Sequence, residues 1–344
     1  MNIGHCNLDN KVFIIAELSA NHNGSLQTAL DTITAMAQSG ADAIKLQTYT
    51  PDTITLDCDS DMFTISQGTL WDKRKFYDLY AEAMTPWEWH KELFDHARSL
   101  GMLAFSSPFD PSAVDFLDKL NVPAYKIASF EITDIPLIEY TAAKGKPIII
   151  STGIAQLKEI KDALDACRRM GNNRITLLKC TSAYPATLEE MNLLTIPDMI
   201  KRFDVTIGLS DHTMSLSASI AAVALGARVI EKHFILKRNM GGADSAFSLE
   251  PHEFRAMVDA VRDTEKLLGN ITYDLSPKSL KSREFSRSLF IAENVQAGEV
   301  ITVKNVRSVR PGFGLSPKYQ KEIIGKIFRA DYLKGTPLAW EHIE

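Results

Sequence analysis

The sequence predicts an α/β fold of the (β/α)8-barrel type, followed by a small β-rich domain. Eight short apolar runs alternate with helical patterns over about 265 residues, and each run ends in a polar or ionisable residue. Functional groups of such barrels gather at the carboxyl ends of the strands. A doubly wound sheet is the structural alternative, but no GxGxxG turn follows the first run. The expected strands are residues 12–16, 43–47, 103–106, 124–127, 147–151, 175–180, 205–209 and 227–231.

Helix boundary signals support the alternation. Ser25 is expected to cap the first helix, and Thr85 to cap a later one with Pro86 at its first position. Gly40 and Gly101 stand where helices end in a left-handed residue.

The connection from residue 47 to residue 84 is too long for a simple strand-to-helix loop. Its second half, residues 71–83, has helical spacing and aromatic side chains. Long loops of this kind often cover the mouth of a barrel. For Lys73, Arg74 and Lys75 a solvated helix face is favoured over contact with a ligand.

The expected domain boundaries are a barrel at residues 1–269, a polar linker at 270–286 and a small domain at 287–344. The small domain contains short β-type and turn-rich pieces. A domain of this size has a marginal core of its own.

Composition excludes several function classes. The formal charge of the 344 residues is -5 and the pI is near 5.9, which argues against a nucleic-acid partner. The four cysteines lack CxxC spacing, and no signal peptide or apolar run of about 20 residues is present. A cytoplasmic protein without membrane contact is expected.

Two of the apolar runs end in histidine, at His212 and His233. These runs are strands seven and eight, which are neighbours in a closed barrel, so the two imidazoles can converge on one divalent metal such as Mn²⁺ or Zn²⁺. The alternative is that each histidine is only a hydrogen-bonded residue of the barrel mouth.

Lys45, Lys126 and Lys179 lie inside apolar runs, where an unpaired ammonium is costly to bury. Neighbouring carboxylates can pair with them, but a phosphorylated or carboxylated ligand is the favoured partner because hydroxyl donors recur at the strand ends. These hydroxyls belong to Ser107, Ser129, Ser151, Ser182 and Ser210.

Three acids have candidate roles in acid–base chemistry or in binding hydroxyl groups. Glu17 and Glu231 end strands one and eight, and Asp244 lies in a glycine-rich turn. Pairing with the strand lysines is the alternative role. The segment from Asn21 to Ser25 precedes a helix and is a weak candidate for binding an anion or a hydroxyl.

Taken together, these segments resemble the sialic acid synthase family of nonulosonate synthases. The resemblance runs from about residue 12 to the end of the chain. The segments that carry it are Ile-Ala-Glu17-Leu-Ser-Ala-Asn21-His22, Ala-Ile-Lys45-Leu-Gln47-Thr, Ser-Ser107-Pro-Phe, Ala-Tyr-Lys126-Ile-Ala-Ser129, Ser151-Thr-Gly, Lys-Cys-Thr-Ser182-Ala-Tyr184-Pro, Gly-Leu-Ser210-Asp-His212-Thr and Glu231-Lys-His233-Phe.

The resemblance implies a condensation of phosphoenolpyruvate with an open-chain amino sugar in a TIM barrel, followed by an antifreeze-like SAF domain. His212 and His233 would bind the metal, typically Mn²⁺, which would activate the sugar aldehyde. Arg310 of the SAF domain would reach the barrel mouth of a partner subunit, which implies a domain-swapped homodimer.

The resemblance also assigns the remaining site residues. Ser182 departs from the asparagine of the sialic acid synthases, which puts its phosphate contact in doubt. The implied catalytic residues are Glu17, Lys45, Lys126, Glu231 and Arg310, and the implied substrate-binding residues are Asn21, Gln47, Ser107, Ser129, Ser151, Ser182, Tyr184, Ser210 and Asp244.

The segment Leu-Trp71-Asp-Lys-Arg-Lys-Phe-Tyr resembles the branch of the family whose sugar is 2,4-diacetamido-2,4,6-trideoxy-L-altrose. Legionaminic or N-acetylneuraminic acid synthesis is the close alternative. Two readings from other classes are a non-enzymatic carbohydrate-binding protein and a metal-dependent sugar isomerase. Neither accounts for the histidine pair together with the lysines and serines.

Overall fold

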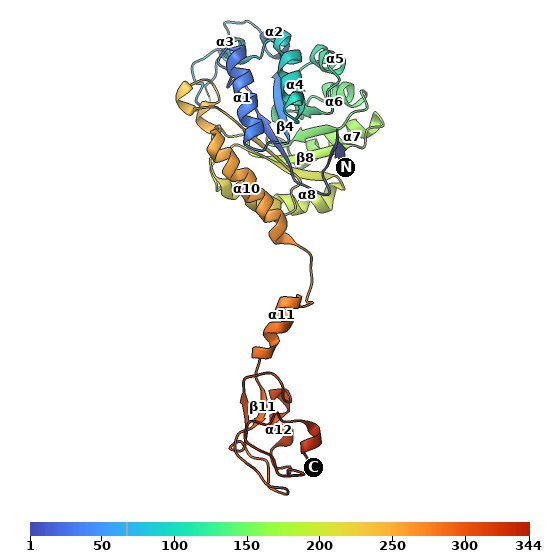
Figure 1. Ribbon diagram of the computed structural model, residues 1–344. Coiled ribbons are helices and arrows are strands. Elements are labelled where there is room, and N and C mark those ends of the chain that lie inside the picture. Colours follow the sequence, from blue (N-terminus) through green and yellow to red (C-terminus); the bar gives the residue numbers. More distant parts are fainter. Residues whose placement is uncertain (67) are drawn as a thin grey trace. The chain divides into compact units, whose positions relative to one another are not determined.

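The computed structural model describes residues 1–66 and 68–344. The chain divides into two compact units, Met1–Gly269 and Asn270–Glu344. In the first unit, eight parallel strands close into a barrel, and the helices that connect them lie around its outside (Figure 1). The (β/α)8 prediction is confirmed.

All eight predicted strands are present, and their ends differ from the prediction by at most two residues. They could be recognised because both faces of each strand are buried, which selects nearly continuous apolar runs. The strands are β3 (Phe13–Glu17), β4 (Ala43–Thr48), β5 (Leu103–Pro108), β6 (Tyr125–Ile127), β7 (Ile148–Ser151), β8 (Ile175–Cys180), β9 (Thr206–Asp211) and β10 (Val229–His233).

The barrel closes between its last and first strands. β10 pairs with β3 so that His233 lies opposite Glu17, and β3 pairs with β4 so that Glu17 lies opposite Lys45. The register therefore brings residues from both ends of the barrel sequence to adjacent places at its carboxyl edge.

The helices of the barrel unit include one or more after every strand. Ser25 caps α1 by accepting a hydrogen bond from the Thr28 N–H, as predicted, and Gly40 and Gly101 have φ angles of 88° and 84°. The helices are α1 (Leu26–Gln38), α2 (Pro51–Ile54), α3 (Phe76–Ala83), α4 (His90–Ser99), α5 (Pro111–Lys119), α6 (Ile135–Ala142), α7 (Leu157–Arg169), α8 (Thr195–Phe203), α9 (Leu216–Ala224) and α10 (Pro251–Leu268).

Two predictions of helix starts are wrong. Thr85 does not cap α4, because a 3-10 turn, Trp87–Trp89, comes first and the helix begins at His90. In the long connection after β4, α3 begins at Phe76 rather than at residue 71. An N-terminal hairpin of β1 (Asn2–Ile3) and β2 (Cys6–Asn7) was not predicted, because two-residue strands carry no periodic signal.

The second unit has its own small core. β11 (Ser288–Ile291) and β12 (Val306–Val309) pair antiparallel, and α11 (Pro277–Ser282) and α12 (Gln320–Ile323) are its two α-helices. The residues expected to form a linker, 270–286, thus contain a helix. The buried apolar side chains of this unit include Leu289, Ile291, Val306, Phe328 and Leu338.

Among the described residues, no helix has the length and apolar character needed to cross a membrane. All four cysteines are free thiols.

Candidate active site

Two buried lysines lie at the carboxyl ends of β4 and β6. Lys45 Nζ forms an ion pair with Glu17, and it lies 3.4 Å from Ser107 Oγ and 3.9 Å from Glu231 Oε2. Lys126 Nζ lies 3.4 Å from Glu231 Oε1. The carboxylates that sequence analysis offered as alternative partners therefore do pair with the lysines, inside one cluster.

Burial and mutual charge set the pKa values of this cluster. Burial holds the pKa of Lys126 below its usual value, although Glu231 opposes the shift. Burial alone would raise the pKa of Glu231, but Lys126 and Lys45 hold it below its usual range. Glu231 is therefore a carboxylate held between the ammonium groups of Lys45 and Lys126. Because its pKa is lowered, the charged form of Lys126 is less stable than that of an exposed lysine.

Serine hydroxyls surround the lysines. Ser182 Oγ donates to Ser129 Oγ at 2.8 Å, and Ser210 Oγ donates to Glu231 Oε1 at 3.0 Å. Ser151 Oγ is buried and has no hydrogen-bond partner among the described residues. A Cβ at Gly153 would collide with the hydroxyls of Ser182 and Ser129, so only glycine leaves both hydroxyls in place. Ser182, which departs from the family pattern, thus belongs to this group.

The two predicted metal ligands lie side by side at the ends of β9 and β10. The ring centroids of His212 and His233 are 5.4 Å apart. His212 Nδ1 is 3.0 Å from the Thr181 carbonyl oxygen, which can only accept, so Nδ1 carries the hydrogen. Burial lowers the pKa of His212, but contact with Cys180 outweighs burial and holds this pKa above its usual value. Burial and the neighbouring charges of His212 and Lys45 hold the pKa of His233 well below its usual value, so its imidazole is neutral.

This arrangement fits a divalent metal with two protein ligands. Metal binding needs neutral imidazoles whose other nitrogen is oriented by a hydrogen bond, which His212 provides. His233 Nδ1 is buried without a hydrogen-bond partner among the described residues, 3.9 Å from Asp244 Oδ2. In the parts of the chain that the structure describes, no group of three or more His, Cys, Asp or Glu side chains is arranged to hold a metal. Further ligands would come from water or substrate.

Polar side chains continue from the histidines toward the loops after β3 and β10. Gln47 Nε2 donates to Ser19 Oγ at 2.9 Å and lies 3.4 Å from Glu17 Oε1. Asn21 Nδ2 donates to the Phe234 carbonyl and to Ser248 Oγ, whereas Asn21 Oδ1 is buried and has no hydrogen-bond partner in the part of the chain that the structure describes. The same two loops and the end of α3 line a cavity of about 380 Å³.

Aromatic rings lie over the histidines. The Tyr184 ring is 4.5 Å from the ring of His212, and the Phe247 ring is 4.9 Å from the ring of His233. Trp71 follows, with its ring 5.8 Å from that of Tyr184. Sequence analysis singled out Tyr184 but missed Phe247, which stands three residues after Asp244.

Glu131 is a further acid that sequence analysis missed. It lies in a 3-10 turn, Ser129–Glu131, directly after β6, and its Oε2 is buried without a hydrogen-bond partner. Burial raises the pKa of Glu131 to about 7, although Lys126 and Lys45 oppose the rise. The sequence feature that could have indicated Glu131 is its position two residues after Ser129, in the loop that follows the same strand.

Other residues lie apart from this cluster. Lys179 Nζ donates to the Cys180 carbonyl and to Thr181 Oγ1, with no carboxylate partner among the described residues. Arg310 lies exposed in the second unit. Of the basic run, Arg74 pairs with Glu82 and Lys75 with Asp59, as surface ion pairs.

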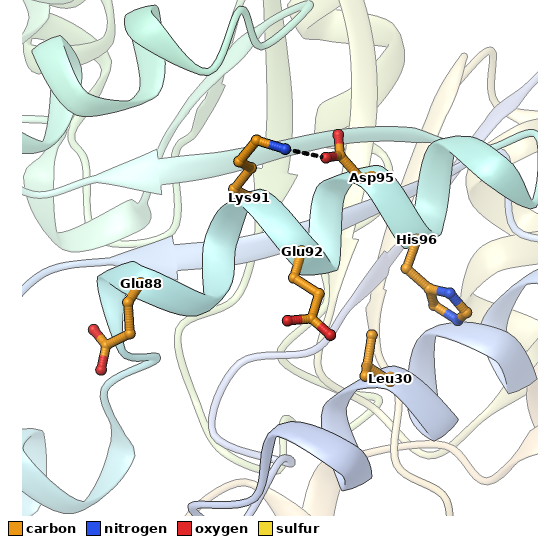
Figure 2. A pocket seen from close by; sticks show the side chains of 6 residues that line it. All are labelled: Leu30, Glu88, Lys91, Glu92, Asp95 and His96. Atoms are coloured by element: carbon orange, nitrogen blue, oxygen red, sulfur yellow. Dashed lines mark hydrogen bonds and ion pairs between the residues drawn. The ribbon is translucent and has the colours of Figure 1, made fainter.

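A second hollow, of about 540 Å³, lies between α1 and α4, away from the strand ends (Figure 2). Lys91 there is paired with Asp95 at 2.7 Å, and His96 Nε2 lies 2.8 Å from Thr34 Oγ1. These contacts are those of a charged helix surface, and the cluster at the barrel mouth remains the candidate site.

The fold and the cluster define a class: barrel enzymes in which lysines, carboxylates and hydroxyls gather beside two adjacent histidines at the carboxyl ends of the strands. Comparison with known proteins gives the family. Residues 32–273 match the NeuB family and residues 286–344 match the SAF domain. The chain belongs to the NeuB family.

Characterised relatives make three different sugars. The chain is 51% identical over 338 residues, 98% of each chain, to the pseudaminic acid synthase of Campylobacter jejuni strain 81-176. It is 35% identical to the N,N'-diacetyllegionaminic acid synthase of Legionella pneumophila, over 96% of this chain and 94% of that one. Among solved structures, the N-acetylneuraminic acid synthetase of Leptospira borgpetersenii has a TM-score of 0.74 and 29% identity, over 83% of this chain and 95% of that one.

Proposed function

We propose that this protein is a pseudaminic acid synthase that condenses phosphoenolpyruvate with 2,4-diacetamido-2,4,6-trideoxy-L-altrose and releases phosphate. The observation that carries the proposal is 51% identity to a pseudaminic acid synthase over 98% of both chains. The lysine and serine cluster beside two adjacent histidines supports it, because one site then offers an anion cradle and a place for a metal.

The phosphate and carboxylate of phosphoenolpyruvate would lie among the lysines and hydroxyls. Lys126 and the Ser129–Ser182 pair are assigned to the phosphate, with Ser107, Ser151 and Ser210 completing the cradle. Lys45 is assigned to the carboxylate or the phosphate. Fixed donors of this kind stabilise charge as it develops, because they need no reorganisation during the reaction.

The open-chain sugar would lie between the histidines and the polar side chains of Glu17, Gln47 and Asp244. A divalent ion held by His212 and His233, with Mn²⁺ as the assigned metal, would supply Lewis acidity toward the aldehyde oxygen. C3 of phosphoenolpyruvate then forms a bond to the sugar C1. Water adds at C2, and the C2–O bond to phosphate breaks as the lysines stabilise the leaving anion.

Protons must leave the attacking water and reach the developing sugar hydroxyl. Lys126 and Lys45 hold the pKa of Glu231 below its usual range against the effect of burial, which suits Glu231 to binding and orientation. Burial raises the pKa of Glu17 although Lys45 opposes the rise, but its carboxylate is already in an ion pair with that lysine. Glu131, whose pKa is raised by burial to about 7, has no such partner among the described residues and a proton affinity suited to neutral pH. We assign Glu131 the proton transfer at C2.

A domain-swapped homodimer is part of the proposal. Arg310 is exposed and has no ion pair among the described residues, so it is available to an anionic ligand of another subunit. Mixing an Arg310→Ala chain with a His233→Ala chain tests this. Recovered activity in verified mixed dimers supports action in trans, and none contradicts it. The proposed location is the cytoplasm, in keeping with the four free thiols.

The decisive experiment restores Mn²⁺ to metal-stripped enzyme and follows phosphate release and product mass together. Phosphoenolpyruvate is supplied with the trideoxy diacetamido-altrose, with N-acetylmannosamine or with the legionaminic precursor. Metal-dependent release with the altrose sugar alone is the expected result. Release only with another sugar replaces the product assignment, and no release with any of them overturns the synthase assignment.

Legionaminic acid synthesis is the second candidate, because the relative that makes it also covers nearly the whole chain. Its lower identity, 35% against 51%, makes legionaminic acid synthesis less favoured than pseudaminic acid synthesis.

A further inference from the structure

Resting on the proposed function, we propose that Trp71 is a specificity residue of this site, and that its ring forms the wall that receives the 6-methyl group of the 6-deoxy sugar. The residue lies in the long connection after β4, between that strand and α3. It would select a 6-deoxy sugar over the corresponding sugar with a 6-hydroxyl group.

Trp71 is held in place from two directions. Its indole Nε1 donates to the Ala243 carbonyl at 3.1 Å. Its ring lies 5.8 Å from that of Tyr184 and 6.4 Å, edge to face, from that of Phe247. Ala243 precedes Asp244 and also lines the cavity of about 380 Å³. The long connection is therefore fastened through Trp71 to the loop that carries a proposed sugar contact.

Trp71 lies beyond the rings that contact the histidines. Tyr184 and Phe247 each contact one of the two histidines, at 4.5 and 4.9 Å between ring centroids, and Trp71 is one ring further out. An open-chain sugar whose C1 is held at the histidines carries C6 at its opposite end. The end that carries C6 is therefore the end that we place against Trp71.

The chemistry of this wall favours a methyl group. The polar atom of Trp71 is already bonded to Ala243, and the Tyr184 hydroxyl interacts with Ser182. Phe247 has no polar side-chain atom. A 6-hydroxyl group placed here would lose water without gaining a partner, whereas a methyl group gains only apolar contact.

The test compares kcat/KM for the 6-deoxy sugar with that for its 6-hydroxy counterpart, 2,4-diacetamido-2,4-dideoxy-L-altrose. Trp71→Ala is expected to lower the ratio of the two values about tenfold, because one pocket contact of this kind is worth about 10- to 200-fold in discrimination. Trp71→Phe keeps an apolar ring without the indole hydrogen bond, and it is expected to retain most of the preference.

The chain offers a matched control. Trp87 Nε1 also donates to a backbone carbonyl at 3.1 Å, that of Tyr49, and its ring packs on Phe116 rather than near the histidines. Trp87→Ala should leave the ratio unchanged. If Trp71→Ala lowers both kcat/KM values equally, Trp71 only anchors the loop and the inference is wrong. If the alanine variant does not fold, Trp71→His decides: its polar ring is expected to lower the ratio, and an unchanged ratio contradicts the inference.

Failure of the proposed function would look different. Wild-type enzyme that releases phosphate with neither altrose sugar overturns the proposed function and this inference with it. Wild-type enzyme that is active on both sugars without preference contradicts only the inference.

Discussion

Two groups of buried lysines and carboxylates share strands β9 and β10, but they lie on opposite faces of the barrel wall. Asp211 and Lys232 are direct partners across the two strands, and so are Ser210 and Glu231 one position earlier. Because successive side chains of a strand alternate between its faces, the first pair points away from the site that contains Glu231. The comparison separates what holds the barrel together from what is available to a ligand.

The outer pair is satisfied within the protein. Lys232 Nζ lies 2.5 Å from Asp211 Oδ2 and 2.5 Å from the Thr213 carbonyl oxygen. Asp211 also accepts hydrogen bonds from the Thr213 N–H and from Ser219 Oγ of α9. One cation and one anion, both fully buried, thus connect the two histidine-bearing strands and a helix.

The inner group keeps unused hydrogen-bonding capacity. Glu231 Oε2, Glu131 Oε2, Ser151 Oγ and His233 Nδ1 are buried and lack a hydrogen-bond partner among the described residues. Buried polar atoms are normally paired, so several orphans in one place indicate a site built for a ligand. Lysine–carboxylate pairing therefore occurs in both groups, and what distinguishes the site is the remaining unpaired atoms.

The largest expected effect is on stability, at the outer pair. Lys232→Met leaves Asp211 buried without its cation and is expected to lower the free energy of unfolding by about 3–5 kcal/mol. The double variant Asp211→Leu with Lys232→Met removes both charges and should recover most of the loss. Urea denaturation measures both, and a double variant as unstable as the single one would contradict the balanced-pair interpretation.

Removing a histidine should affect activity instead of folding. His233→Ala is expected to lower phosphate release roughly 10³-fold, because the site loses one of its two proposed metal ligands. Mn²⁺ binding measured by calorimetry should weaken in parallel. His96→Ala, on α4, is the control and should change neither. Full Mn²⁺ affinity in His233→Ala would remove His233 from the metal site.

A smaller loss is expected at Lys126. Lys126→Met removes one of the cations beside Glu231 and is expected to lower kcat about 10²-fold, with a raised KM for phosphoenolpyruvate. Lys179→Met provides the matched control, since Lys179 is also a strand lysine but donates to Cys180 and Thr181 and pairs with no carboxylate among the described residues. Equal losses in the two variants would show that the inner group has no special role in binding the anion.

The sequence could predict the barrel because burial of both strand faces leaves an apolar run that is easy to recognise. The apolar run does not show, however, toward which face of the strand a given side chain points. Lys45, Lys126 and Lys179 all interrupt such runs, and their orientation could not be predicted from the runs alone. Residues on irregular turns were harder still. Glu131 lies on a 3-10 turn and Trp71 in a long connection, where no periodicity marks a residue, and Trp71 is placed by its hydrogen bond to Ala243.

The last expected effect is a pH dependence that belongs to Glu131. Burial raises the pKa of Glu131 from the ordinary 4.5 to about 7, against the opposing charges of Lys126 and Lys45 and with the support of Asp134. Between these pH values the folded protein keeps a proton that the unfolded chain has released, so the contribution of Glu131 to stability falls as the pH rises and is constant above about pH 7. Glu131→Gln removes this contribution, and the difference in unfolding free energy between the variant and the wild type should therefore change between pH 5 and pH 7.5. The variant should also lose the limb of the kcat–pH profile near pH 7, while Glu131→Asp should keep a limb at a shifted pH. If the unfolding free energies of the wild type and of Glu131→Gln vary identically with pH, the pKa of this carboxyl is not raised in the folded protein. If their kcat–pH profiles are also identical, Glu131 carries no proton in the reaction.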